Sequence, residues 1–241
     1  MSAELKNRNL YDELITGKGY QIIQIENMQV LDELRKSFVE KINLYLKVDN
    51  NIESVRKKLA SLSKAEINKA MIKLLSFTNL SEMMVKTCPV SIKSLCGNNL
   101  FIQRRAHTTI NLPGKGQAKQ WAHYELMSGI SPFSFVMWVP LHDLEDEGGV
   151  YYIDQKSSSE IMINEEKAGL VNGPKVLGLM TDQVPAKMKY GEAILFNPFV
   201  LHGNIQFQSD LARIACNVRF QSHKKPLLQK NSDYLKFFSF N

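Results

Sequence analysis

The chain has 241 residues, of which 44% are hydrophobic, 22% charged and 9% aromatic. These values are typical of a globular domain and exclude disorder as the main state. The 13 glycines and 8 prolines follow no repeat, which excludes a collagen-like fibre. Three cysteines are too few for a disulfide framework, and we expect reduced thiols in a cytoplasmic protein.

The formal net charge is +6. A partner rich in phosphate or carboxylate would explain it, but so would a lysine-rich surface. The second interpretation is favoured because no block of about five like charges occurs. The first ten residues contain no apolar signal-peptide core, and no stretch approaches about 18 apolar residues, so we expect no membrane association.

The first part of the chain predicts one strand and several helices. Residues 19–25 alternate between polar and apolar after a glycine turn, which predicts a strand. Apolar residues recur with helical spacing from Val30 to Tyr45. Ser63 and Glu66 form a capping-box pattern before another helix. A further helix is expected from about Ser81 to near Pro89.

From Leu100 onward the pattern changes to short strands separated by glycine and proline turns. This pattern favours a sandwich or barrel, with the preceding helices packed outside it. We therefore predict a mainly β fold with packed helices (α+β), in a single domain spanning 1–241. The predicted strands cover residues 100–110, 133–141, 150–153, 193–196 and 211–220.

One group of residues has the composition of a metal site. His123 and Glu125 form an H-x-E pattern, and on a strand two such residues point to the same face. His202 supplies a second imidazole far downstream. Two histidines and one carboxylate are the ligand set of non-haem Fe(II) oxygenases, and they leave coordination positions open.

The last strong strand adds positive charge to this picture. Its alternation predicts that Arg213, Ala215, Asn217 and Arg219 face one side, while Ile214, Cys216, Val218 and Phe220 face the other. Two arginines would then face the barrel interior, where an uncompensated charge is costly. An anionic group is therefore expected there.

These motifs together resemble a known family. The order H-x-[DE], then a histidine about eighty residues later, then Arg213 eleven residues further on, is similar to the Fe(II)/2-oxoglutarate dioxygenase superfamily. The segments Trp138–Leu141 and Gly191–Gly203 resemble its phytanoyl-CoA hydroxylase-like branch. The resemblance covers roughly Leu100 to Gln221, and residues 19–25 resemble the family's opening strand.

The resemblance implies a double-stranded β-helix (a jelly-roll or cupin-like core) over 100–222. Residues 1–99 would form a mostly helical support, and 223–241 a C-terminal tail. His123, Glu125 and His202 would hold Fe(II), and 2-oxoglutarate would bind with its far carboxylate on Arg213. Asn204 would add a hydrogen bond to that carboxylate. O₂ would be the co-substrate, and a small polar metabolite or a carbohydrate or secondary-metabolite intermediate would be hydroxylated, with release of succinate and CO₂.

Further site residues are weaker predictions. Arg219 competes with Arg213 as the anchor for 2-oxoglutarate, and this choice stays open. His107 and His142 are expected to be structural. Other candidates near the co-substrate are Asn217, Gln103 and Arg105, and candidates near the substrate are Trp121, Asn111 and Trp138.

Two departures from the family pattern bear on function. Glu125 replaces the commoner Asp but keeps the ligand oxygen, and residues 154–158 have lost the family's substrate-side motif. Two alternatives remain, namely a non-oxidative, cupin-like metal-binding protein and a nucleic-acid demethylase, the latter suggested by the basic charge. We expect a small-molecule substrate and neither membrane nor nucleic-acid binding. The oligomeric state is left open, a homo-oligomer being one option.

Overall fold

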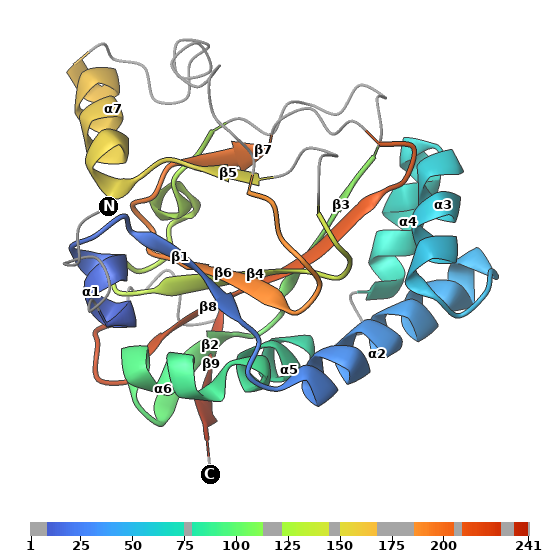
Figure 1. Ribbon diagram of the computed structural model, residues 1–241, viewed down its shortest axis with the longest axis horizontal. Coiled ribbons are helices and arrows are strands. Elements are labelled where there is room, and N and C mark those ends of the chain that lie inside the picture. The colour runs from blue at the N-terminus through green and yellow to red at the C-terminus, as the bar shows by residue number, and fades with distance from the viewer. Residues whose placement is uncertain are drawn as a thin grey trace.

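A computed structural model describes residues 9–74, 79–112, 122–144, 150–167, 186–204, 209–227 and 234–240 (Figure 1). The helices are α1 (Leu10–Ile15), α2 (Met28–Leu46), α3 (Ile52–Ser61), α4 (Lys64–Leu74), α5 (Leu80–Thr87), α6 (Pro89–Cys96), the 3₁₀ helix η2 (Glu125–Ser128) and α7 (Gln155–Lys167). The strands are β1 (Tyr20–Gln24), β2 (Asn99–Gln103), β3 (His107–Asn111), β4 (Phe135–Pro140), β5 (Val150–Tyr152), β6 (Glu192–Phe196), β7 (His202–Asn204), β8 (Arg213–Ser222) and β9 (Leu235–Ser239).

The larger sheet is antiparallel and follows the order β1-β6-β4-β8-β2-β9, with β3 also paired to β8. The long strand β8 is its centre, since it pairs with β4 along one edge and with β3 and β2 along the other. A smaller antiparallel sheet consists of β5 and β7. Figure 1 shows this small sheet on the side of the large sheet opposite α5 and α6.

The two faces of β8 have different surroundings, as its alternating sequence predicts. Ile214, Cys216, Val218 and Phe220 belong to the larger hydrophobic cluster, which also contains buried residues of the helices. Ala215 belongs to a second cluster with residues of both sheets. The predicted alternation is therefore confirmed, and the face with Arg213 and Arg219 points away from the helical layer.

The helical layer owes its position to the apolar face of α2. Leu31, Leu34, Phe38 and Ile42 recur with helical spacing and are fully or almost fully buried. The helix ends at Lys47, whose backbone is left-handed (φ 53°). These side chains belong to the same hydrophobic cluster as Ile214, Cys216, Val218 and Phe220 of β8. The helices therefore pack against the face of the large sheet opposite Arg213 and Arg219.

Three further observations concern the sequence-based expectations. The first strand, β1, lies inside the predicted range 19–25. The segment 223–241 is more than a tail, because β9 pairs in register with β2 and extends the large sheet. The short sequence of β9 shows no clear apolar alternation, so a strand was not predicted there. Among the described residues, no helix is long and apolar enough to cross a membrane.

Candidate metal centre and its cavity

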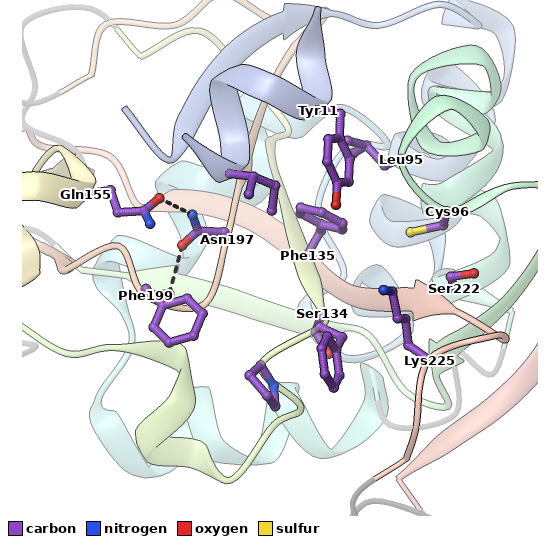
Figure 2. Close-up of a pocket in the computed structure, with 13 residues that line it drawn as sticks. Tyr11, Leu95, Cys96, Ser134, Phe135, Gln155, Asn197, Phe199, Ser222 and Lys225 are labelled. Atoms are coloured by element: carbon purple, nitrogen blue, oxygen red, sulfur yellow. Dashed lines mark hydrogen bonds between the residues drawn. The ribbon is translucent and has the colours of Figure 1, made fainter. Parts of the chain in front are cut away.

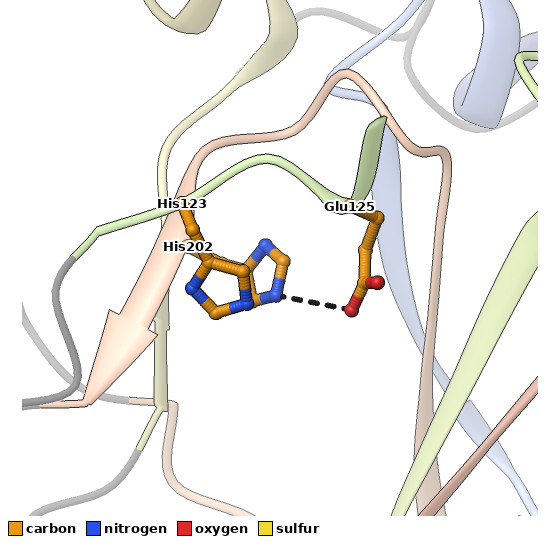
Figure 3. Close-up of side chains that lie close together, drawn as sticks. All are labelled: His123, Glu125 and His202. Atoms are coloured by element: carbon orange, nitrogen blue, oxygen red, sulfur yellow. Dashed lines mark ion pairs between the residues drawn. The ribbon is translucent and has the colours of Figure 1, made fainter. Parts of the chain in front are cut away.

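Three potential metal ligands converge in the space between the sheets. Each of His123, Glu125 and His202 offers one ligand atom, and these atoms lie within 4.8 Å of one another (Figure 3). Glu125 and His202 are buried, while His123 is partly exposed. The predicted set of two imidazoles and one carboxylate is thus brought together by the fold.

The two histidines are neighbours because their backbones pair. His123 N–H donates to the carbonyl of His202 (2.9 Å), and His202 N–H donates to that of His123 (3.1 Å), in an isolated antiparallel bridge. Residues directly opposite in such a pair have their side chains on the same face. The ring centroids are accordingly 4.3 Å apart.

Glu125 does not lie on a strand, contrary to the expectation from the H-x-E pattern. It begins the 3₁₀ helix η2, and only the residue before it, Tyr124, is extended (φ −101°, ψ 142°). One extended residue is enough to send its two neighbours to one side and its own side chain to the other. Tyr124 indeed points away and donates its hydroxyl to the carbonyl of Ser158 (2.7 Å).

His202 is oriented by its own backbone environment. Its Nδ1 lies 3.0 Å from the carbonyl oxygen of Val200, and because a carbonyl can only accept, Nδ1 carries the hydrogen. In the neutral ring this leaves the Nε2 lone pair available as a ligand. Nε2 lies 3.6 Å from Oε1 of Glu125. The rings of Tyr152 and Phe196 pack against His202 at 5.7 and 4.8 Å.

The electrostatic environment keeps Glu125 ionised. Burial alone would raise the pKa of its carboxyl group, but the side chains in contact with it, among them the positively charged Arg219, lower the pKa to about 2. Arg219 contacts Oε2 through Nε (2.7 Å) and Nη2 (2.5 Å). An ionised carboxylate beside two imidazoles is the form that a divalent cation requires.

The three ligands open into a cavity of about 270 Å³, hereafter the site cavity. It is lined by aromatic and polar side chains, which is usual for a small-molecule site. Among them are His107, Trp138, Tyr152, Arg213, Asn217 and Arg219.

The two arginines of β8 differ in what they contact. Arg213 donates to Oδ1 of Asn204, and its guanidinium lies 5.9 Å from the Trp138 ring centroid. Burial lowers the pKa of Arg213 to about 10, which still leaves it charged at neutral pH. Arg219 instead forms the buried ion pair with Glu125.

The residues that were weaker predictions for the co-substrate and substrate sites lie in different parts of the structure. Asn217 and Trp138 line the site cavity. Gln103 lies outside that lining and accepts a hydrogen bond from the backbone N–H of Arg219 (3.2 Å). Asn111 is buried opposite Arg213 in the β3–β8 register, and Arg105 is exposed outside the cavity lining. Trp121 lies outside the described residues.

Sequence reasoning missed two tyrosines. Tyr152 lines the site cavity, and among the described residues its buried hydroxyl has no hydrogen-bond partner. Burial raises its pKa, so it stays protonated. The hydroxyl of Tyr234 lies 2.7 Å from Nη1 of Arg219. For Tyr152, the sequence indicated only a position on a predicted strand. For Tyr234, no sequence pattern indicated a role in the site.

The two histidines expected to be structural lie in different settings. His142 is buried, accepts the backbone N–H of Ile214 at Nε2 (3.0 Å) and lies with Nδ1 2.7 Å from the carbonyl of Asp143. His142 is therefore a structural group, as predicted. His107 lines the site cavity, and burial together with the charge of Arg219 lowers its pKa.

A second cavity of about 280 Å³ lies between α1, α6 and the start of β4 (Figure 2). At its rim Asn197 donates to the side chain of Gln155 (2.6 Å) and to the carbonyl of Leu14 (2.5 Å), and it accepts the backbone N–H of Phe199 (2.9 Å). Asn197 therefore ties the turn before His202 to α1 and α7.

Comparisons with known proteins identify the fold. No protein-family model and no curated protein matches the sequence. Among solved structures, the α-ketoglutarate-dependent non-haem carbocyclase SnoK from nogalamycin biosynthesis is 14% identical, with a TM-score of 0.55 over 96% of this chain and 92% of its own. HygX from Streptomyces hygroscopicus, solved with nickel and 2-oxoglutarate, is 11% identical, with a TM-score of 0.54 over 95% and 90%. EctD from S. alaskensis with bound iron is 14% identical, with a TM-score of 0.53 over 95% and 79%.

At such low identity these likenesses show a shared fold and no more. The chain has the mixed helix and antiparallel-sheet fold of SnoK, HygX and EctD. The phytanoyl-CoA hydroxylase-like branch stays a prediction, since a shared fold does not assign the chain to a branch.

Proposed function

We propose that the protein is a non-haem Fe(II) and 2-oxoglutarate-dependent oxygenase built on a double-stranded β-helix. The observation that carries this proposal is the convergence of His123, Glu125 and His202 in the lining of a polar cavity. The fold neighbours include enzymes solved with iron or with nickel and 2-oxoglutarate, which supports it.

The donor set fits a divalent first-row metal. Two neutral imidazoles and one carboxylate bind one face of an octahedral ion and leave positions for a chelating co-substrate and O₂. Zinc in a structural site would require a fourth protein ligand to close a tetrahedron. Among the described residues, the ligand cluster contains only these three.

The polar residues of the site cavity suit a dicarboxylate. We assign the far carboxylate of 2-oxoglutarate to Arg213, with Asn204 at its side, because Arg219 is already engaged by Glu125. A guanidinium binds a carboxylate with two parallel hydrogen bonds. The Tyr152 hydroxyl, without a partner among the described residues, would donate to the same bound anion.

With iron and 2-oxoglutarate bound, the site would supply the oxidising power for C–H oxidation, with O₂ consumed and succinate and CO₂ released. The protein would bind and orient both molecules and exclude water through the buried rings of Tyr152 and Phe196. Trp138 and Asn217 would contact a small polar substrate. We propose hydroxylation as the outcome, although one neighbour is a carbocyclase, so the fold does not select the reaction.

Anaerobic titration tests the proposal directly. The protein with Fe(II) is expected to develop a visible charge-transfer band on addition of 2-oxoglutarate, and to release succinate when O₂ is admitted. Metal binding without either signal would favour the non-oxidative, cupin-like alternative. A nucleic-acid demethylase has no specific support from the structure, and absence of binding to DNA or RNA at low salt would exclude it.

A further inference from the structure

The buried carboxylate of Glu125 also contacts a residue outside the three candidate ligands, Arg219. The carboxylate uses its two oxygens differently, with Oε1 facing His202 and Oε2 held by Arg219. The two Arg219 contacts, at 2.7 and 2.5 Å, both reach the same oxygen. That oxygen is therefore occupied, and Oε1 is the oxygen that faces His202.

Arg219 is itself fixed by two other parts of the chain. Its Nη1 donates to the hydroxyl of Tyr234 (2.7 Å), in the segment that leads into β9. Nη1 also contacts Oε1 of Gln103 on β2 (3.4 Å), and the Arg219 backbone N–H donates to that same oxygen (3.2 Å). The guanidinium is thus held at Nη1 by two neighbours, while Nε and Nη2 face Glu125.

The length of the Glu125 side chain explains why fixing its carboxylate would matter for metal binding. Glu125 stands on the short helix η2, and its side chain has one more rotatable bond than aspartate. A flexible ligand must lose that freedom when it binds a metal, unless the protein has already fixed it. The ion pair with Arg219 does this before any metal arrives.

We propose that Arg219, held by Tyr234 and Gln103, is a positioning residue that presents Glu125 to the metal through Oε1 alone. This inference rests on the proposed metal centre. It also makes the C-terminal segment part of the site, since removing the Tyr234 hydroxyl would loosen Arg219. We call Arg219, Tyr234 and Gln103 together the clamp. Because Arg219 occupies Oε2, Glu125 would take one coordination position and leave the next one to the co-substrate.

The test measures Co²⁺ affinity by competition with a chelating indicator, without 2-oxoglutarate or O₂. Arg219→Met is expected to weaken Co²⁺ binding by about 10- to 100-fold, the usual cost of losing a group that orients a ligand. Tyr234→Phe is expected to weaken it by about 5-fold, the value of one hydrogen bond. The matched control is Arg56→Met, because Arg56 is also a buried arginine paired with a glutamate, Glu53, and it lies outside the site cavity.

A double-mutant cycle separates positioning from general loosening. Glu125→Asp draws the carboxylate back by one methylene, so Arg219→Met should weaken Co²⁺ binding by less than about 3-fold in that background. Full additivity of the two losses would overturn the proposal, and so would wild-type affinity in Arg219→Met. If Arg219→Met does not fold, Tyr234→Phe decides the matter, and an unchanged affinity there overturns the proposal.

The metal centre and the clamp can fail separately. Unchanged Co²⁺ affinity in His202→Ala would refute the metal centre, and the clamp with it. A large loss in His202→Ala with no loss in Arg219→Met would refute the clamp alone.

Discussion

His123 and His202 exchange a reciprocal pair of backbone hydrogen bonds, and their rings consequently lie 4.3 Å apart. A pair of imidazoles placed by the main chain needs no side-chain contact to stay together. This arrangement makes the bridge between the small sheet and the segment before η2 the structural basis of the candidate metal centre.

The first prediction concerns the metal ligands. His123→Ala and His202→Ala should each lower metal affinity by more than about 100-fold and abolish iron-dependent turnover, because an open site with two ligands holds a metal poorly. Isothermal titration with Ni²⁺ or Co²⁺ measures this. His223→Ala is the control, since His223 bonds the Asn99 carbonyl outside the site cavity and should leave affinity unchanged.

Arg213 should act on the co-substrate and not on the metal. Arg213→Ala is expected to raise the 2-oxoglutarate requirement by about 10- to 100-fold, the value of hydrogen bonds to a charged group, with metal affinity unchanged. The requirement is read from the charge-transfer band at increasing 2-oxoglutarate. An unchanged requirement would transfer the anchoring role to Arg219.

His142 should make stability depend on pH. Burial, and then the charge of Arg56, lower its pKa from an ordinary value near 6.5 to about 4. Between these two values the unfolded chain binds a proton that the folded chain does not, so the free energy of unfolding falls as pH drops. The loss should reach about 3 kcal/mol near pH 4.

Urea denaturation at several pH values measures this loss. The control is His142→Gln, which should be less stable at pH 7.5 but should show a flatter dependence between pH 6.5 and 4. An equally steep dependence in His142→Gln would assign the effect to other groups.

Asn197 should support the site from a distance. Asn197→Ala removes its hydrogen bonds to Leu14, Gln155 and Phe199, leaving buried polar groups unsatisfied. We expect a loss of about 2 kcal/mol and a Tm lower by about 4–8 °C. The exposed Asn98→Ala serves as the control, with a change within about 0.5 kcal/mol. Equal melting temperatures for the two variants would contradict the role of Asn197.

The three thiols should be unreactive in the folded protein. Cys88, Cys96 and Cys216 are buried, and burial raises their pKa values to about 11, 12 and 12. Because the thiolate is the reactive form, we expect slow reaction with a thiol reagent at pH 8 and complete reaction in denaturant. Rapid modification without denaturant would show that one of these sites opens readily.

Local patterns determined much of the fold in advance. The alternation along β8 follows from the period of a strand, and the buried face of α2 follows from helical spacing, so both were readable from sequence. Residues 235–239 were missed because a short edge strand has too few residues to establish a period.

The ligand residues were also predicted from sequence, but their geometry was not. His123, Glu125 and His202 were singled out by residue type and by resemblance, while the strand expected for His123 and Glu125 proved to be a single bridge followed by a 3₁₀ helix. Sequence placed Arg213 and Arg219 on one face of β8 and favoured Arg213 as the anchor for 2-oxoglutarate, but it could not say what each arginine contacts. Only the tertiary structure separated them, because the charge that each arginine meets comes from another part of the chain, Glu125 on η2 for Arg219, and neither strand period nor composition carries that information.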